Sequence, residues 1–503
     1  MEQSVIASIG VQELCRLFKD DENLWTKSPV HGRDVLVQHN YERAFRVSNK
    51  LRTRNHNSWI EASRSFAYDN WTYLFPNMVA KEETIAVLSP GSSEDNPDGS
   101  LKLMYKELQV TSPLVAKRKF TCLRTCKQID QGTWVVADIS YEPILNLNGY
   151  HSNYRRLPSG CLIQSISEKL SKVTWVEHME VEETMPSHTL YDHLIRSGLA
   201  FGAERMLACL ERWHEKMSHL NDICRIRTPG LEGKVAPWIM EKFSLMELRD
   251  SMVSGLFENI SPNEDKNSSL WQSITGLDDL KVYATLYKSS SNYEVVGGAV
   301  TFGVNYSPEF VLKILGDERK HHEWDVVGGL RKLNMVTQYL TAGDPRNNVF
   351  ASMIEGSSDG ILIKEVNVNR SGSLVVWTTV SKKVYDLISL GKAPPPDVPV
   401  LISGFSISTD GHTTTTNRGG SVVTLVLRMW GVGNKPLQEK GPESVALITL
   451  AINQTAERVK ESLEKQRPPS PPRGVWPTEK QQVGGDDMET EILQNELRLL
   501  KMD

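Results

Sequence analysis

Long apolar segments are missing from this sequence. Nowhere in its 503 residues is there a run of about 18 apolar residues, the length that a membrane-spanning helix requires. The N-terminal residues also lack the basic stretch and continuous apolar core of a secretory signal. We therefore expect neither a membrane span nor a secretory signal. Instead, the first 18 residues have the apolar spacing of an amphipathic helix, carried by Ile6, Ile9, Leu14, Leu17 and Phe18.

Cysteine and excess positive charge are also scarce. The chain has six cysteines, none of them in a Cys-x-x-Cys pair, and Cys122 and Cys126 lie in a strand-like stretch at a spacing that suits zinc poorly. We expect buried free thiols in a reducing compartment and no metal site. A net charge of −5 and a pI near 6.2 argue against a large nucleic-acid surface, which needs a clustered basic excess.

Strand patterns followed by a helix occur in the first half of the chain. Short apolar-rich segments separated by Gly, Pro, Asn and Ser predict strands at 101–110, 120–128, 133–141, 161–166 and 172–181. Residues 188–217 then have apolar residues at helical spacing, which predicts one long helix.

The same order of elements recurs after a transitional stretch at 220–270. Strands are predicted at 295–302, 361–368, 373–380 and 421–430, a helix opens at Ser307-Pro308, and a closing helix starts at Pro442. Because the chain is too long for one core, we expect domains at 1–217 and 281–466, a connecting segment at 218–280 and a disordered tail at 467–503. The predicted fold class is α+β, with a curved antiparallel sheet around a long C-terminal helix in each domain. Such a sheet leaves room for a small ligand beneath the helix.

Two opposite charges stand out in the first predicted sheet. Strand alternation places Tyr105 and Glu107 on the apolar face of one strand, and Phe120, Cys122 and Arg124 on the apolar face of another. A lone buried charge is costly, so Glu107 and Arg124 should pair. We predict that these five residues bind a ligand, with the charges anchoring the hydroxyl or keto group of a lipid. A structural ion pair, or edge residues that reach solvent, are the alternatives.

Three segments resemble enzyme motifs but lack the surrounding elements or spacing that those motifs require. Gly356–Gly360 matches the Gly-x-Ser-x-Gly nucleophile elbow, but a strand pattern follows where a helix is required, so we predict a hairpin turn. His214 and His219 are five residues apart, which on a helix separates the imidazoles by about 140° and prevents them from sharing a metal. Gly431-x-Gly433 lacks a third glycine and a βαβ unit, which favours a turn. We expect no catalytic site and no cofactor apart from a possible lipid or sterol ligand.

Several longer motifs resemble the plant class IV homeodomain–leucine-zipper transcription factors. Five segments resemble the lipid-transfer (START) domain of that family, at 108–115, 123–128, 156–161, 171–178 and 201–205. Segments 317–319, 323–325 and 371–376 resemble the second, START-associated domain of the family. The resemblance covers roughly residues 8–465. It implies a helix-grip fold in both halves, a lipid or sterol ligand, and a nuclear role in epidermal gene regulation, with the cytoplasm as an alternative location.

The sequence also departs from that family. Family members begin with a homeodomain and a zipper, but this sequence has no Trp-Phe-x-Asn recognition helix and no sustained heptad repeat. Glu61–Ser65 resembles the family but joins almost directly to Trp71, where family members carry at least one further helical turn. We therefore expect a lipid-binding regulator that contacts other transcription regulators and does not bind DNA directly. The alternatives are a truncated transcription-factor relative with a defective pocket, or a helix-grip enzyme.

Overall fold

The structure of the chain is a computed structural model that describes most of residues 2–466. Within that range, it leaves out residues 20–22, 28–33, 46–57, 70–78, 94–95, 141–153, 168–169, 183–188, 197, 213–236, 258–259, 261–271, 276–280, 289–293, 342–343, 370, 391, 393–399, 413–418 and 431–436. The predicted tail at 467–503, the pair His214 and His219, the motif Gly431-x-Gly433 and the domain boundary at 217/218 all lie outside the described residues. These interpretations stay predictions.

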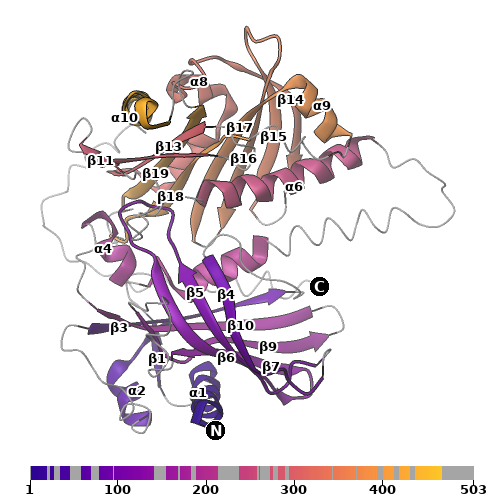
Figure 1. The fold of residues 1–503 in the computed structure, drawn as a ribbon, viewed down its shortest axis with the longest axis vertical. Helices are drawn as coiled ribbons and strands as arrows, with labels where there is room; N and C mark the ends of the chain where they lie inside the picture. The colour runs from indigo at the N-terminus through magenta and orange to yellow at the C-terminus, as the bar shows by residue number, and fades with distance from the viewer. Residues whose placement is uncertain are drawn as a thin grey trace, which may run out of the picture. The chain divides into compact units, whose positions relative to one another are not determined.

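The first half of the chain forms one antiparallel sheet (Figure 1). Its strands run in the order β1-β2-β3-β10-β9-β7-β6-β5-β4, and β8 pairs with β10 beside this path. Alternation along β10 sends Trp175 to one face and Val176 to the other, and both are buried, so the sheet is covered on both sides. The strands are β1 (Trp25–Lys27), β2 (Asp34–Leu36), β3 (Ser58–Asp69), β4 (Val79–Ser89), β5 (Ser100–Leu108), β6 (Arg118–Asp130), β7 (Thr133–Ser140), β8 (Arg155–Arg156), β9 (Ser159–Ser167) and β10 (Leu170–Glu182).

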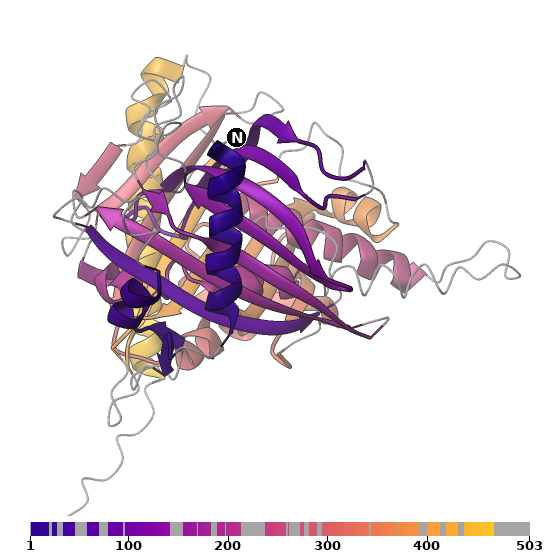
Figure 2. The same cartoon turned by 90° about the horizontal axis from the view of Figure 1, so that it is seen from below.

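Helices cover the two faces of this first sheet. Figure 2 shows α1 (Glu2–Phe18) lying across the strands on one face, where Leu14 shares a core with Val176. The short helix α2 (Gln38–Ala44) joins the same core through Tyr41. On the opposite face, α4 (Thr189–Arg196) and the helical segment 203–212 share a second core with Trp175. We call this second side the inner face.

The single long helix predicted over 188–217 is wrong. The chain instead forms α4 and then a separate helical segment at 203–212, with turns between them. Gly198 has a φ of 73°, in the left-handed region that commonly ends a helix. The amide of Ala200 then donates to the carbonyl of Leu194 at 3.0 Å, which turns the chain back over the end of α4. The apolar spacing continued through the break because both helices bury residues on the same face of the sheet.

The second half repeats this arrangement around its own sheet. Its strand order is β11-β12-β13-β19-β18-β17-β16-β15-β14, antiparallel throughout. Gly356, with a φ of 74°, lies in the turn between β15 and β16, which confirms the hairpin predicted at Gly356–Gly360. The strands are β11 (Gln272–Thr275), β12 (Lys281–Lys288), β13 (Glu294–Val304), β14 (Leu333–Leu340), β15 (Asn348–Ile354), β16 (Gly360–Asn369), β17 (Gly372–Ser381), β18 (Ile402–Thr409) and β19 (Ser421–Trp430).

Helices again cover both faces. The closing helix α10 (Leu437–Lys465) and α7 (Pro308–Gly316) share a core with Trp324 and Phe405 on one face. The helices α6 (Pro237–Phe257) and α9 (Lys382–Ser389) share another core with Val376 on the other face. The predicted start of α7 is confirmed, because the Ser307 hydroxyl accepts the amide of Phe310 at 3.4 Å as an N-cap. Two short helices, η3 (Glu318–Lys320) and α8 (His321–Trp324), follow α7. Each half is therefore an α+β helix-grip unit, as predicted.

Candidate ligand site

The register between β5 and β6 separates the five residues that the sequence singled out. Lys106 lies opposite Phe120 and Met104 opposite Cys122, so Phe120, Cys122 and Arg124 share a face with the even-numbered residues of β5. Tyr105 and Glu107 lie on the other face of the sheet. The residues that share a face within each strand were predicted correctly. The prediction that the apolar faces of β5 and β6 lie on the same side of the sheet was wrong.

The predicted pairing of Glu107 with Arg124 is therefore wrong. Glu107 accepts a hydrogen bond from the Tyr105 hydroxyl at 2.8 Å and lies 3.4 Å from the ammonium group of Lys117. Arg124 instead pairs with Asp138, directly opposite it on β7, through bonds of 2.7 and 2.9 Å, and also with Glu82 of β4. Both charges have partners on their own faces of the sheet, so neither requires the other. Whether the five residues bind a ligand stays a prediction.

A cluster of charged side chains lies on the inner face of the first sheet, four of them buried and two, Arg124 and Glu82, partly exposed. Its centre is Asp138, which contacts three cations: Arg124, Arg156 at 3.6 Å and Lys106 at 3.9 Å. Burial alone would raise the pKa of Asp138, but the neighbouring cations, Arg124 foremost, hold it well below its usual range. The Asp138 carboxyl is therefore ionised at neutral pH. We call Asp138, Lys106, Arg124, Arg156, Glu177 and Glu82 the charge cluster.

Arg156 and Glu177 extend the charge cluster along β8 and β10. Their side chains are essentially inaccessible to solvent and form an ion pair at 2.5 Å. The indole N–H of Trp175 donates to the same Glu177 oxygen at 2.8 Å. The Nε of Arg156 and the second carboxylate oxygen of Glu177 are buried and have no hydrogen-bond partner among the described residues. Burial raises the pKa of Glu177, and Arg156 opposes that change. Both atoms, and also the Nη1 of Arg156, thus keep unused hydrogen-bonding capacity.

Apolar and aromatic side chains surround the charge cluster. Arg156 lies over the ring of Phe120, with 5.8 Å between its guanidinium carbon and the ring centroid. Burial raises the pKa of the Cys122 thiol to about 12, so it remains a neutral, small apolar group. The core above the cluster is formed mainly by the 203–212 segment and the turn before it, with Phe201, Met206, Leu207 and Leu210. This face therefore combines an apolar enclosure with a few convergent polar groups, the usual character of a small-molecule site.

The interior of the second half contains a buried lysine packed among aromatic rings, in place of a cluster of paired charges. Lys364 is buried there, donates to the Leu315 carbonyl at 2.7 Å and lies over the Trp324 ring at 5.3 Å. Burial lowers the pKa of Lys364 to about 7. Trp324 packs at 5.1–5.2 Å against Trp377 and Phe405. These rings pack edge to face in the core of the second half, so the first half is the better candidate for a ligand site.

No helix in the described part of the chain is long and apolar enough to cross a membrane. Within the same residues, no three His, Cys, Asp or Glu side chains are grouped so that they could hold a metal ion.

Most residues of the charge cluster were not predicted from the sequence. Asp138 interrupts the apolar stretch Thr133–Ser140, and Glu177 and Glu180 interrupt Val173–Val181, so charges in both strands were visible. What the sequence does not reveal is the register that brings Asp138 opposite Arg124 and Met179 opposite Arg156. Without that register, each charge could be placed on a strand but not beside a partner.

Comparisons with known proteins agree with this division into halves. The model of the START domain family matches residues 11–216, and the model of the PDF2-like C-terminal domain family matches residues 239–465. Among solved structures, human StAR-related lipid transfer protein 5 aligns with a TM-score of 0.29 and 13% identity, over 43% of this chain and 99% of its own.

Similar whole proteins come from Arabidopsis and rice. Homeobox-leucine zipper protein HDG12 of Arabidopsis thaliana is 34% identical over 491 residues, which cover 92% of this chain and 69% of that protein. HDG11 of the same plant is 33% identical, covering 91% and 66%. ROC8 of Oryza sativa subsp. japonica is 30% identical, covering 92% and 71%. The chain thus spans about two thirds of the length of these relatives, and it belongs to the class IV homeobox-leucine zipper family of plants.

Proposed function

We propose that the first half of this protein binds a lipid or sterol on its inner face, and that the bound state regulates transcription through contacts with other proteins, without catalysis. The observation that carries the proposal is the charge cluster beneath an apolar enclosure. A lipid has a long apolar body and one polar end, so it matches a site with those two parts.

The chemistry of the charge cluster supports a polar anchor. The second carboxylate oxygen of Glu177 can accept from a ligand hydroxyl, and the Nε of Arg156 can donate to a ligand oxygen, because neither atom has a partner among the described residues. Phe120 and Cys122 lie on the same face and would contact the apolar part of the ligand. A buried polar atom left without a partner costs about 1–3 kcal/mol, so a ligand that satisfies it gains affinity and orientation.

The direct test is extraction of lipids from the purified chain, followed by mass spectrometry. We expect a lipid or sterol to co-purify, and the Glu177→Gln variant to retain several-fold less of it, because an amide is a weaker acceptor than a carboxylate. Glu107→Gln makes the same chemical change on the opposite face of the sheet and should retain as much lipid as the wild type. Absence of lipid from the wild type, or equal loss in both variants, would contradict the proposal.

The regulatory part of the proposal follows from the family. The relatives named above are homeobox-leucine zipper proteins, which supports a nuclear location and partners among transcription regulators. Imaging of a fluorescent fusion of the whole chain in plant epidermal cells tests the location. We expect nuclear fluorescence, and a signal confined to the cytoplasm would contradict this part.

A further inference from the structure

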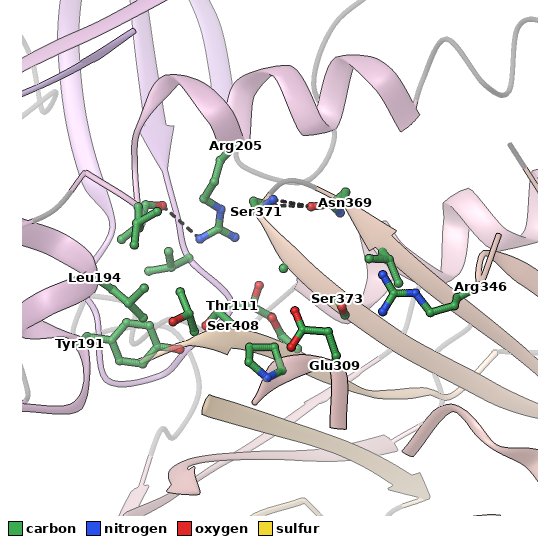
Figure 3. Close-up of a pocket in the computed structure, with 18 residues that line it drawn as sticks. Thr111, Tyr191, Leu194, Arg205, Glu309, Arg346, Asn369, Ser371, Ser373 and Ser408 are labelled. Carbon is green, nitrogen blue, oxygen red and sulfur yellow. Dashed lines mark hydrogen bonds between the residues drawn. The ribbon is translucent and has the colours of Figure 1, made fainter. Parts of the chain in front are cut away.

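A pocket of about 200 Å³ lies between the two halves of the chain, and none of its lining residues belongs to the charge cluster (Figure 3). The first half contributes residues of α4 and the 203–212 segment, and the second half contributes residues at the ends of β16, β17 and β18. We call it the interface pocket. It is smaller than the roughly 300–1,000 Å³ of pockets for drug-sized ligands, so a small group fits it best.

The walls of the interface pocket are joined by direct contacts. The Ser112 hydroxyl of the first half lies 2.9 Å from the Thr301 hydroxyl of β13, and Thr301 lies 2.8 Å from Thr424 of β19. Tyr191, which lines the pocket, reaches Thr424 at 3.3 Å. Outside the pocket lining, Arg212 of the first half forms two bonds of 2.5 and 3.0 Å with Glu365 of β16. A group bound in the pocket would therefore contact both halves at once.

Arg205 extends into the interface pocket with most of its donors unused (Figure 3). One of its terminal nitrogens donates to the Ala200 carbonyl at 3.0 Å. Its Nε is buried and has no hydrogen-bond partner among the described residues. Within the same part of the chain, Arg205 forms no ion pair, and burial lowers its pKa. Arg205 is partly buried, so the absence of a counter-charge disfavours its guanidinium group, and an anion bound beside the buried Nε would relieve that cost.

A second unpartnered polar group lines the same pocket. Thr111 is 3% exposed, and its hydroxyl oxygen has no hydrogen-bond partner among the described residues. The opposite wall, from the second half, presents the side chains of Ser373 and Ser408, and that of Ser371, whose hydroxyl donates to Asn369 at 2.7 Å (Figure 3). The serine hydroxyls offered to a ligand are therefore those of Ser373 and Ser408. The pocket is thus lined by one guanidinium group and several hydroxyl groups around a small space.

Two other charged residues, Glu309 and Arg346, line the pocket. Glu309 and Arg346 are exposed, and Arg346 is held by Asp344 through bonds of 2.7 and 2.6 Å. Glu309 is solvated, so its negative charge is screened from the interior. The unpaired charge inside the pocket is therefore the positive charge of Arg205.

We propose that the interface pocket binds the phosphate group of a small phosphate compound or of a phospholipid, with Arg205 and Thr111 as donors from the first half and serine hydroxyls as donors from the second. Arginine suits this role because its planar fork of N–H donors matches the oxygens of a phosphate. Binding holds the two halves together, because its donors come from both. This site is separate from the lipid site proposed on the inner face and does not depend on it.

The test is titration calorimetry of the whole chain with inorganic phosphate, at an ionic strength matched with sodium chloride. A second arm measures co-flotation with vesicles of phosphatidylcholine that contain phosphatidic acid, which distinguishes free phosphate from a lipid headgroup. For whichever of the two probes the wild type binds, we expect Arg205→Gln to weaken binding by at least about tenfold, the effect of losing one charge-assisted hydrogen bond. Arg319→Gln is the matched control, because Arg319 is 83% exposed, and it should bind like the wild type.

A second variant keeps the proposal testable if Arg205→Gln does not fold. Ser408→Asp adds a negative charge to the opposite wall of the pocket and should abolish binding by repulsion while Arg205 remains in place. Loss of binding in either variant, with the control unchanged, supports the site. Binding of neither probe by the wild type, or equal binding by the wild type and a folded variant, would overturn it.

Discussion

Replacement of Asp138 by asparagine is the perturbation for which the structure predicts the largest effect. Asp138 is the carboxylate shared by Arg124, Arg156 and Lys106, and its side chain is 6% exposed. The change keeps the shape of the side chain but leaves a neutral amide beside three cations, of which Lys106 and Arg156 are buried. Removing one partner of a buried ion pair costs about 3–5 kcal/mol, so we expect Asp138→Asn to lower the free energy of unfolding by that amount at pH 7.

The pH dependence provides a second signature of the same contact. The cations hold the folded-state pKa of Asp138 well below that of an unfolded aspartate, which is about 3.9. A carboxyl with a lowered folded pKa stabilises the protein fully above the unfolded pKa, and this stabilisation is lost as the pH falls toward the folded pKa. The stability gap between the wild type and Asp138→Asn should therefore be constant from pH 7 to about pH 5 and narrow below about pH 4.

Urea unfolding of both proteins, followed by circular dichroism at several pH values, measures this gap. Asp386→Asn is the control, because Asp386 pairs with Lys382 at an exposed i,i+4 position, where such pairs contribute only about 0.3–0.5 kcal/mol. A cost below about 1 kcal/mol for Asp138→Asn at pH 7, or a gap that does not change down to pH 3, would refute the reasoning.

Three further predictions concern other parts of the molecule. Because Glu107 and Arg124 lie on opposite faces of the sheet, the effects of Glu107→Met and Arg124→Leu on the free energy of unfolding should add within about 0.5 kcal/mol in a double-mutant cycle. A larger coupling energy would show that the two side chains interact. Because burial lowers the pKa of Lys364 to about 7, the unfolded state binds more protons between pH 7 and about pH 10. Stability of the wild type relative to Lys364→Met should therefore rise over that range in urea titrations, and a flat difference would contradict the buried, neutral lysine. With a net charge of −5, the 503-residue chain should show no sequence-specific duplex binding in gel shifts at physiological salt, and nanomolar, sequence-dependent binding would contradict this.

The fold could largely be predicted from the sequence, because its signals are local. Strand alternation, turn residues and the Ser307-Pro308 helix start are each encoded within a few neighbouring residues. The break between α4 and the 203–212 segment was missed because apolar spacing continues across it. Gly198 and Gly202 were visible there, but an isolated glycine does not by itself end a predicted helix.

The candidate sites were less predictable, because they depend on which strand lies beside which. Arg124 could be recognised as a charge on an apolar face, but its partner Asp138 follows only from the register of β6 with β7. The interface pocket was still harder to predict, because Arg205 and Ser373 come from different halves of the chain. Contacts of such long sequence separation leave no periodic signal in a single sequence.

Photo-crosslinking of the whole chain with a diazirine-bearing sterol and a diazirine-bearing phospholipid, followed by peptide mass spectrometry, tests the central claim most directly. We expect labelled peptides from the inner face of the first half, around Phe120–Cys122 and Trp175–Met179, which lie outside the interface pocket. Excess unlabelled lipid should compete for this labelling. Labelling confined to the second half, or to the face that carries Tyr105 and Glu107, would contradict it.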